Sequence, residues 1–186
     1  MKMLKNRNIA ILIAAIIIIL ATLFGVGSSL NSLARNVEEM FYDGVYMEAA
    51  GFTERSINNH LGVLEQAVLD TSSLFANHPE LSSEAEALRY ARRELVDAQS
   101  ISEKYSAYQS IQRASSAFIS KANTVELSER EKESLVQFQS TLTGTTGAIQ
   151  RSEYNVRARG FMDEASMFAR LLRPFVFVTA PQAFDA

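Results

Sequence analysis

The chain has 186 residues, with 18 basic and 21 acidic side chains and no cysteine. The lack of cysteine excludes a lipoprotein anchor and a disulfide-stabilised secreted domain. Without its first 27 residues the chain carries 15 basic and 21 acidic side chains, a net charge of −6, so binding to nucleic acid is not expected. The remaining 159 residues are enough for one domain with a substantial core.

Residues 9–27 form an apolar run without a charged residue, IAILIAAIIIILATLFGVG. As an α-helix this run is about 28 Å long, close to the roughly 30 Å hydrocarbon core of a bilayer. Its apolar side chains favour insertion by about 4 to 7 kcal/mol. We therefore expect a single transmembrane helix here, in contact with membrane lipid.

The charges on either side of the apolar run predict its orientation. Lys2, Lys5 and Arg7 precede it, and the next charged residue is Arg35. Positive charge is retained on the cytoplasmic side of a membrane. We therefore expect a short cytoplasmic N-terminus at 1–8 and an extracytoplasmic body.

A cleaved signal peptide is the alternative for the same run. Gly25 and Gly27 are small residues at the two positions that a signal peptidase reads. The run is longer than the roughly 7 to 15 apolar residues of a signal peptide, which favours a retained anchor. Ala21 and Gly25 also form a small-xxx-small pair, a pattern that allows helices to associate in the membrane.

Long tracts without proline predict long helices in the body. The three prolines of the chain stand at positions 79, 174 and 181, and proline interrupts helices. Apolar residues recur every three or four positions, which is typical of one buried helix face. The pattern predicts helices at 28–77, 83–122 and 128–173. Their similar lengths favour an all-α fold, with three long antiparallel helices in a bundle over 28–173.

The first of these helices contains Gly51, where the apolar pattern slips. A glycine within a helix costs about 1 kcal/mol relative to alanine, which does not force a break. One continuous helix is therefore favoured. A turn at Gly51 would instead give four helices, and would return Arg170, Arg173 and the C-terminal tail to the membrane surface.

Capping boxes predict the starts of the other two helices. Ser83 with Glu86, and Ser128 with Glu131, have the required spacing of three residues. Four acidic residues near the second start also resemble a metal-binding cluster: Glu126, Glu129, Glu131 and Glu133. Basic residues interrupt this cluster and acidic residues are ordinary at helix starts, so no metal site is expected.

The stretch TGTTG, with Gly144 and Gly147, superficially resembles a phosphate-binding loop. Such a loop needs a following lysine and a preceding strand, so a local helix kink is expected instead. With no cysteine and only His60 and His78, the chain has few groups for nucleophilic or metal chemistry. The sequence predicts no catalytic residue, no cofactor and no metal site, and hence no enzyme.

Residues 174–186, PFVFVTAPQAFDA, form an apolar C-terminal tail. Phe175, Phe177 and Phe184 make it too apolar for a free end, and it is too short to span a bilayer. We expect it to fold back and cap the bundle. The alternative is a docking segment for a partner protein.

Short motifs in the C-terminal third suggest a family. Arg151 is followed by the pair Tyr154-Asn155, and Phe161 stands seven residues after the tyrosine. These residues resemble the arginine-rich helix with a repeated Tyr-Asn pair of the LemA family of bacterial membrane proteins. Further similar motifs are Phe168-Ala169, Phe184-Asp185 and Arg55-Ser56-Ile57 with Asn59 and Leu61. Two features of the family are missing here. One is the proline of the stretch that Arg55-Ser56-Ile57 resembles, and the other is the acidic residue ahead of Arg151.

The resemblance implies an antiparallel helical bundle on a membrane tether, with no established enzymatic activity. We expect Tyr154 to lie on the bundle seam and Asn155 to form hydrogen bonds across helices. The favoured function is a single-pass membrane-anchored scaffold of the bacterial cell envelope, acting through protein partners or a homo-oligomer. The alternatives are an extracytoplasmic bundle that senses a small molecule, and a membrane-surface or membrane-shaping protein that acts through its C-terminal tail.

Overall fold

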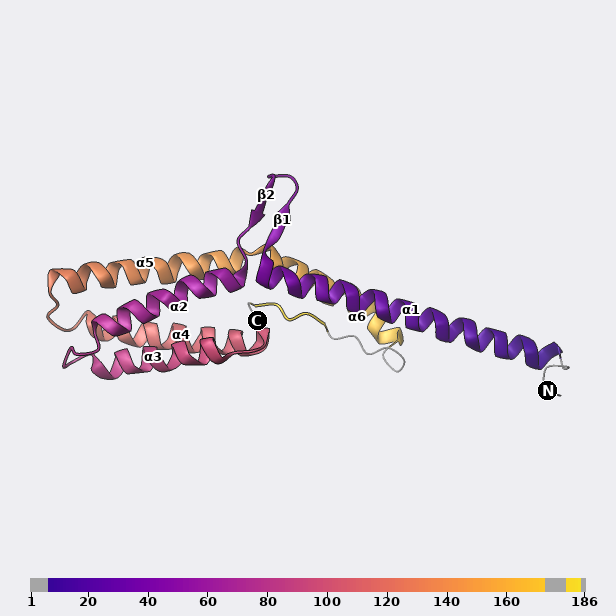
Figure 1. Cartoon of the computed structure of the whole chain (residues 1–186), viewed down its shortest axis with the longest axis horizontal. Helices are drawn as coiled ribbons and strands as arrows, with labels where there is room; N and C mark the ends of the chain where they lie inside the picture. Colours follow the sequence, from indigo (N-terminus) through magenta and orange to yellow (C-terminus); the bar gives the residue numbers. More distant parts are fainter. Residues whose placement is uncertain (1–6, 173–179, 185–186) are drawn as a thin grey trace. The chain divides into compact units, whose positions relative to one another are not determined.

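The computed structural model describes residues 7–172 and 180–184 of the chain. Within them it contains six helices and one two-stranded hairpin (Figure 1). In chain order the elements are α1 (Arg7–Asp43), β1 (Val45–Met47), β2 (Phe52–Glu54), α2 (Ile57–Leu74), α3 (Ser82–Asp97), α4 (Ile101–Ala122), α5 (Glu129–Arg151) and α6 (Glu153–Leu172). The predicted all-α fold with an apolar N-terminal helix is confirmed.

The chain divides into two compact units. The first comprises the described parts of Met1–Glu39 and Arg157–Pro181, and the second those of Met40–Val156 and Gln182–Ala186. Helices α1 and α6 therefore each contribute to both units. In the first unit these two helices run antiparallel (Figure 1).

The second unit is built on a bundle of α2, α3, α4 and α5, in which consecutive helices are antiparallel (Figure 1). Helix α2 packs against α3 and α5, and α3 packs against α4. The Phe118 ring of α4 lies 5.2 Å from Phe75 and 6.3 Å from Phe138, measured between ring centroids. Residues of the three-four apolar pattern that are buried include Leu61, Leu64, Val68, Leu88, Ala91, Leu95, Ile111, Leu135 and Ile149. Val156, which continues the same pattern, is 55% exposed because α5 ends before it.

The prediction of one helix over 28–77 is wrong, because a β-hairpin separates α1 from α2. Its strands are antiparallel, with Val45 opposite Glu54. Gly44 has a φ of +88°, and a Cβ at this position would lie 2.1 Å from the Glu54 carbonyl oxygen. Gly51, in the hairpin turn, has a φ of +70°. Glycine adopts these conformations without the steric cost that other residues meet, so the two glycines together set the break.

The predicted helix over 83–122 is divided into α3 and α4. Ser100 caps α4: its hydroxyl accepts a hydrogen bond from the Glu103 backbone N–H at 3.1 Å, and the Glu103 carboxylate accepts one from the Ser100 backbone N–H. The predicted capping box at Ser83 with Glu86 is wrong. Helix α3 begins one residue earlier, and no side chain caps it.

The predicted helix over 128–173 is divided at Ser152, which has an extended backbone with φ −60° and ψ 133°. The capping box of Ser128 with Glu131 is confirmed. Helix α5 continues through both glycines of TGTTG. Three long helices were therefore the wrong choice, and the second unit contains four.

The end of the C-terminal tail is buried in the second unit. Phe184 is only 1% exposed. The expected return of the tail is therefore found for residues 182–184. Seven other residues named in the sequence analysis have side chains outside the described part of the chain: Phe168, Arg170, Arg173, Pro174, Phe175, Phe177 and Asp185.

Candidate functional site

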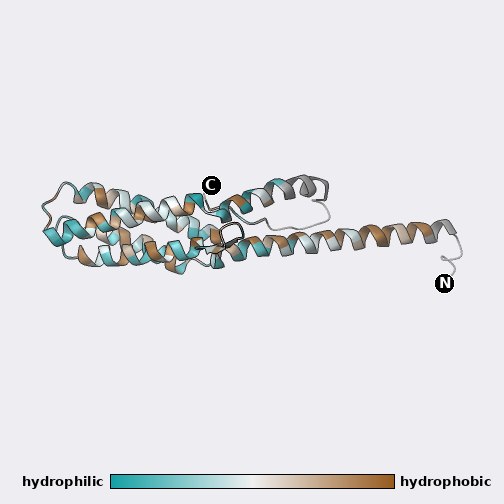
Figure 2. Cartoon of the chain, turned by 90° about the horizontal axis from the view of Figure 1, so that it is seen from above, coloured by the Kyte–Doolittle hydropathy of each residue, from teal (hydrophilic) through white to brown (hydrophobic). Residues whose placement is uncertain are grey.

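The apolar part of α1 is exposed over most of its described length. In the described chain one helix, Ile11–Asp43, is long and apolar enough to cross a membrane, and only 6% of its most apolar window is buried. Ile18 is 64% exposed and Phe24 is 77% exposed. Figure 2 shows the hydrophobic colour concentrated along this half of α1. The core helix of a soluble protein would be mostly buried, whereas this surface suits lipid.

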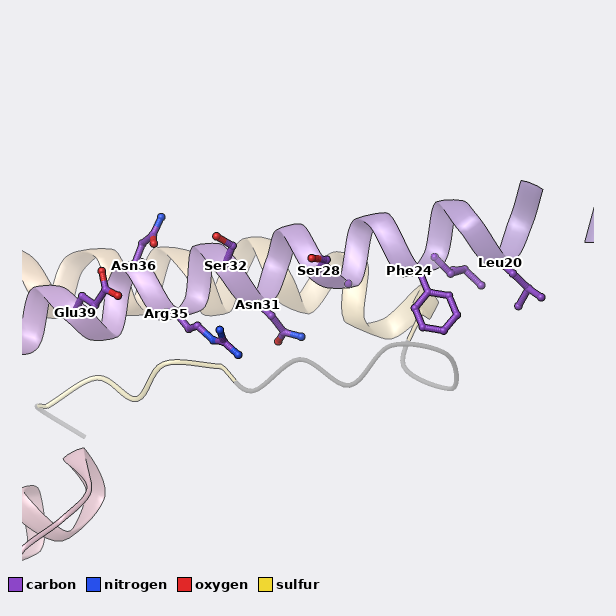
Figure 3. Close-up of a pocket in the computed structure, with 10 residues that line it drawn as sticks. Leu20, Phe24, Ser28, Asn31, Ser32, Arg35, Asn36 and Glu39 are labelled. Carbon is purple, nitrogen blue, oxygen red and sulfur yellow. The ribbon is translucent and has the colours of Figure 1, made fainter. Parts of the chain in front are cut away.

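An open pocket lies on α1 where apolar side chains give way to polar ones (Figure 3). Its described lining residues are Leu20, Leu23, Phe24, Gly27, Ser28, Asn31, Ser32, Arg35, Asn36 and Glu39. All of them belong to the first unit. Figure 3 shows Leu20, Phe24, Asn31 and Arg35 on the same side of the helix, as their spacing requires. The pocket therefore has an apolar end and a polar end.

The polar end of the pocket carries one positive and one negative side chain. Arg35 and Glu39 are four residues apart, which is about one helical turn. Both are exposed, and neither forms an ion pair with any side chain in the described part of the chain. In Figure 3 the Arg35 guanidinium extends along α1 toward Asn31, and so toward the apolar end. Both charges are thus available to a ligand.

An aromatic cluster in the second unit receives the C-terminal tail. The Phe184 ring centroid lies 5.4 Å from that of Phe41, 5.2 Å from Tyr105 and 5.6 Å from Tyr108. Tyr154 lies 5.5 Å from Phe41 on the same measure. The cluster joins the last turn of α1, the start of α4 and the start of α6 to the tail.

Hydrogen bonds from the Tyr154-Asn155 pair hold the tail in place. The Asn155 amide is fully buried; it donates to the Ile149 carbonyl oxygen at 2.9 Å and accepts from the Phe184 backbone N–H at 2.7 Å. The Tyr154 hydroxyl donates to the Gln182 carbonyl oxygen at 2.7 Å. Both residues therefore have a structural role, as the sequence predicted, and the tail is their partner.

The hairpin is attached to the second unit and exposes two aromatic side chains. Val45 is buried, and the Glu54 carboxylate accepts a hydrogen bond from the Glu153 backbone N–H at the start of α6 at 3.0 Å. A negative charge is favourable at a helix N-terminus. Tyr46 is 59% exposed and Phe52 is 57% exposed. Sequence reasoning missed this element, although Gly44 before it and Gly51 in its turn are visible in the sequence.

The residues weighed for catalysis or metal binding lie in separate places. His60 is partly buried on α2, where burial lowers its pKa. The Nδ1 atom of His78, in the turn after α2, is buried without a hydrogen-bond partner among the described residues. Glu131 belongs to a capping box, and Glu129 pairs with Lys132 at 2.8 Å. In the described residues no three histidine or carboxylate side chains are grouped to hold a metal ion.

No family model, curated protein or solved structure matches the chain.

Proposed function

We propose that this chain is a single-pass, membrane-anchored helical scaffold of the bacterial cell envelope, without catalytic activity. The observation that carries the proposal is the exposure of α1 over an apolar stretch long enough to cross a bilayer. Residues 9–27 contact lipid in this proposal. The positive charges at Lys2, Lys5 and Arg7 favour a cytoplasmic N-terminus and an extracytoplasmic body.

The body is suited to contact with other proteins or with copies of itself. The buried side chains of the second unit are mostly aliphatic and aromatic, and the buried amide of Asn155 serves to hold the tail. Tyr46 and Phe52 of the hairpin are exposed, as aromatic residues at protein interfaces often are before binding. The resemblance to the LemA family supports the same proposal, a helical body on a membrane tether.

Membrane fractionation tests the anchor. The full chain, expressed in bacterial cells, should sediment with membranes and remain there in alkaline carbonate. Deletion of residues 1–27 should release it. Recovery of the full chain in the carbonate supernatant would contradict the anchor, and so would a mature chain that begins after residue 27.

Crosslinking in intact cells, followed by mass spectrometry, tests the scaffold role. A reproducible partner protein or a homo-oligomer is expected. A chain that is crosslinked only within itself, in repeated experiments, would contradict the proposal.

A second candidate is a membrane-surface role for the C-terminal region. It is favoured by the antiparallel course of α6, which returns along α1 toward the apolar part of that helix in the first unit (Figure 1). The chain without residues 1–27 should then float with liposomes that contain anionic lipid. Failure to float would exclude this candidate.

A further inference from the structure

The attachment of the C-terminal tail supports an inference about how copies of this chain join, and it rests on the proposed scaffold function. Five side chains of the second unit contact residues 182–184 and are here called the tail site: Phe41, Tyr105, Tyr108, Tyr154 and Asn155. We propose that the tail site also accepts residues 182–184 of a second copy, so that anchored chains are joined by exchange of their tails.

The tail site recognises two backbone groups and one aromatic ring. The Asn155 amide oxygen accepts a hydrogen bond from the Phe184 backbone N–H at 2.7 Å, and the Tyr154 hydroxyl donates one to the Gln182 carbonyl oxygen at 2.7 Å. The Phe184 ring is only 1% exposed. Its ligand is therefore a short peptide segment that carries an aromatic side chain. A second copy is the favoured occupant, because its residues 182–184 offer the same three groups.

The division of the chain into two units makes the tail a separate piece of the second unit. All five side chains of the tail site lie within Met40–Val156, so one continuous stretch of chain provides the whole site. Residues 182–184 also belong to the second unit, but Arg157–Pro181, which precede them along the chain, belong to the first. Identical protomers can exchange such a piece at low cost, because every contact is kept and only the chain that supplies it changes.

The contacts of the tail are few enough for it to leave its own site. One buried phenylalanine ring and two hydrogen bonds correspond to a dissociation constant on the order of 1 mM. Attachment to the same molecule gives an effective concentration on the order of millimolar as well. Undocked tails should therefore be populated. Chains that residues 9–27 confine to one bilayer meet often, which favours capture of an undocked tail by a neighbour.

Photocrosslinking between two variants of the full chain, expressed together in bacterial cells, tests the exchange. The donor carries p-azidophenylalanine in place of Phe184. The acceptor carries Phe184→Ala, which removes the competing ring of its own tail, and an affinity tag. After irradiation we expect position 184 of the donor to be linked to Phe41, Tyr105 or Tyr108 of the acceptor, as identified by mass spectrometry. A wild-type acceptor, whose own tail competes, should give the same link at lower yield.

Two matched controls separate docking from chance encounters. Gln182 is exposed, so p-azidophenylalanine at this position of the donor should not be linked to the three aromatic residues. Tyr154→Phe in the acceptor removes the hydroxyl that donates to the tail and should lower the yield roughly fivefold. Tyr46→Phe removes the same group from an exposed tyrosine of the hairpin and should leave the yield unchanged.

Three results would overturn the exchange. One is a donor that is linked only within its own chain, with either acceptor and at every ratio of the two chains. Another is a donor whose position 184 is linked to a different protein and never to the acceptor. The third is a yield that Tyr154→Phe and Tyr46→Phe leave equally unchanged.

Carbonate extraction of the same cells, and general crosslinking of the wild-type chain, separate this inference from the scaffold function. If the chain stays in the membrane and position 184 is linked to a second copy, both are supported. If the chain stays in the membrane and has partners, but position 184 is linked only within its own chain, the exchange alone is wrong. If the chain is extracted, or has no partner of any kind, the scaffold function is wrong, and the exchange with it.

Discussion

At the residue scale, Gly44 decides where the first helix ends. In Gly44→Ala the new Cβ would lie 2.1 Å from the Glu54 carbonyl oxygen, at a φ of +88°. Both the clash and the backbone conformation are unfavourable, so the free energy of unfolding should fall by about 2 kcal/mol or more. Thermal unfolding of the full chain in detergent, followed by circular dichroism, measures the loss.

Gly51→Ala is the matched control for this prediction. Gly51 also has a positive φ, +70°, but an added Cβ meets no atom within 4 Å. Only the conformational cost of about 1 kcal/mol remains. Equal losses in the two variants would contradict the importance of the close approach to Glu54.

Asn155 is the residue on which the attachment of the tail depends. Asn155→Ala would leave the buried Phe184 N–H without its hydrogen bond and would remove one of the two that the Ile149 carbonyl oxygen accepts, the other coming from the Ser152 backbone N–H. The free energy of unfolding should fall by about 2 kcal/mol or more, since an unpaired buried polar group costs about 1 to 3 kcal/mol. The thermal midpoint measures this loss, and hydrogen exchange at Phe184 should accelerate in parallel.

The neighbouring substitution Val156→Ala controls for this position in α6. Val156 is 55% exposed, and its truncation should change stability by less than about 0.5 kcal/mol. If Asn155→Ala melts like Val156→Ala, the amide does not hold the tail.

At the element scale, the stability of the start of α5 should depend on pH. The Ser128 hydroxyl and its backbone N–H donate hydrogen bonds to the Glu131 carboxylate and lower its pKa. The pKa of Glu131 in the folded state is thus lower than its pKa in the unfolded state, and the unfolded-state pKa is near 4.3. The stabilisation is present above the unfolded-state pKa, and it is lost as the pH falls through the folded-state pKa.

Glu131→Gln keeps a side chain that can complete the capping box but removes the titrating group. Between pH 5 and pH 3, estimated from the unfolded-state pKa, the thermal midpoint should therefore fall less in this variant than in the wild type. Glu133 is an exposed neighbour on the same helix. The thermal midpoint of Glu133→Gln should fall as much as that of the wild type. An identical acid dependence of all three chains would show that the cap does not contribute.

The helix faces of this chain were predictable from sequence, whereas the helix breaks were not. Leu95 and Ile111 lie on one apolar pattern that continues across the short turn between α3 and α4, so the pattern alone suggests one helix. The break depends on Ser100, whose capping box resembles many Ser-x-x-Glu stretches within helices. At Gly44 the decisive contact is with Glu54, which a linear pattern cannot reveal.

The candidate site was also only partly predictable. Arg35 is visible in the sequence as the first charge after the apolar run. That Arg35 and Glu39 line one pocket and form no ion pair in the described chain depends on side-chain contacts. The structural roles of Tyr154 and Asn155 were expected, but their partner was not, because the bond from Phe184 to Asn155 spans 29 positions.

At the scale of the whole molecule, the separation of charge predicts topology. Three basic residues precede the apolar run, and a body with a net charge of −6 follows it. The chain has no cysteine, so a single cysteine introduced into the body reports its location without interference. Ser140 is exposed on α5 and is a suitable site. In spheroplasts, the Ser140→Cys chain should react with a membrane-impermeant maleimide.

Reversal of the flanking charges should lower this labelling. In the Ser140→Cys chain, three neutral substitutions before the run and two lysines after it reverse the bias: Lys2→Gln, Lys5→Gln, Arg7→Gln, Ser28→Lys and Ser29→Lys. Because lysine and arginine are retained in the cytoplasm, a large share of these chains should insert with the body inside. Lys2→Arg with Lys5→Arg preserves the charge and should label fully. A Ser140→Cys chain that reacts only after lysis would place the body in the cytoplasm and contradict the proposed orientation.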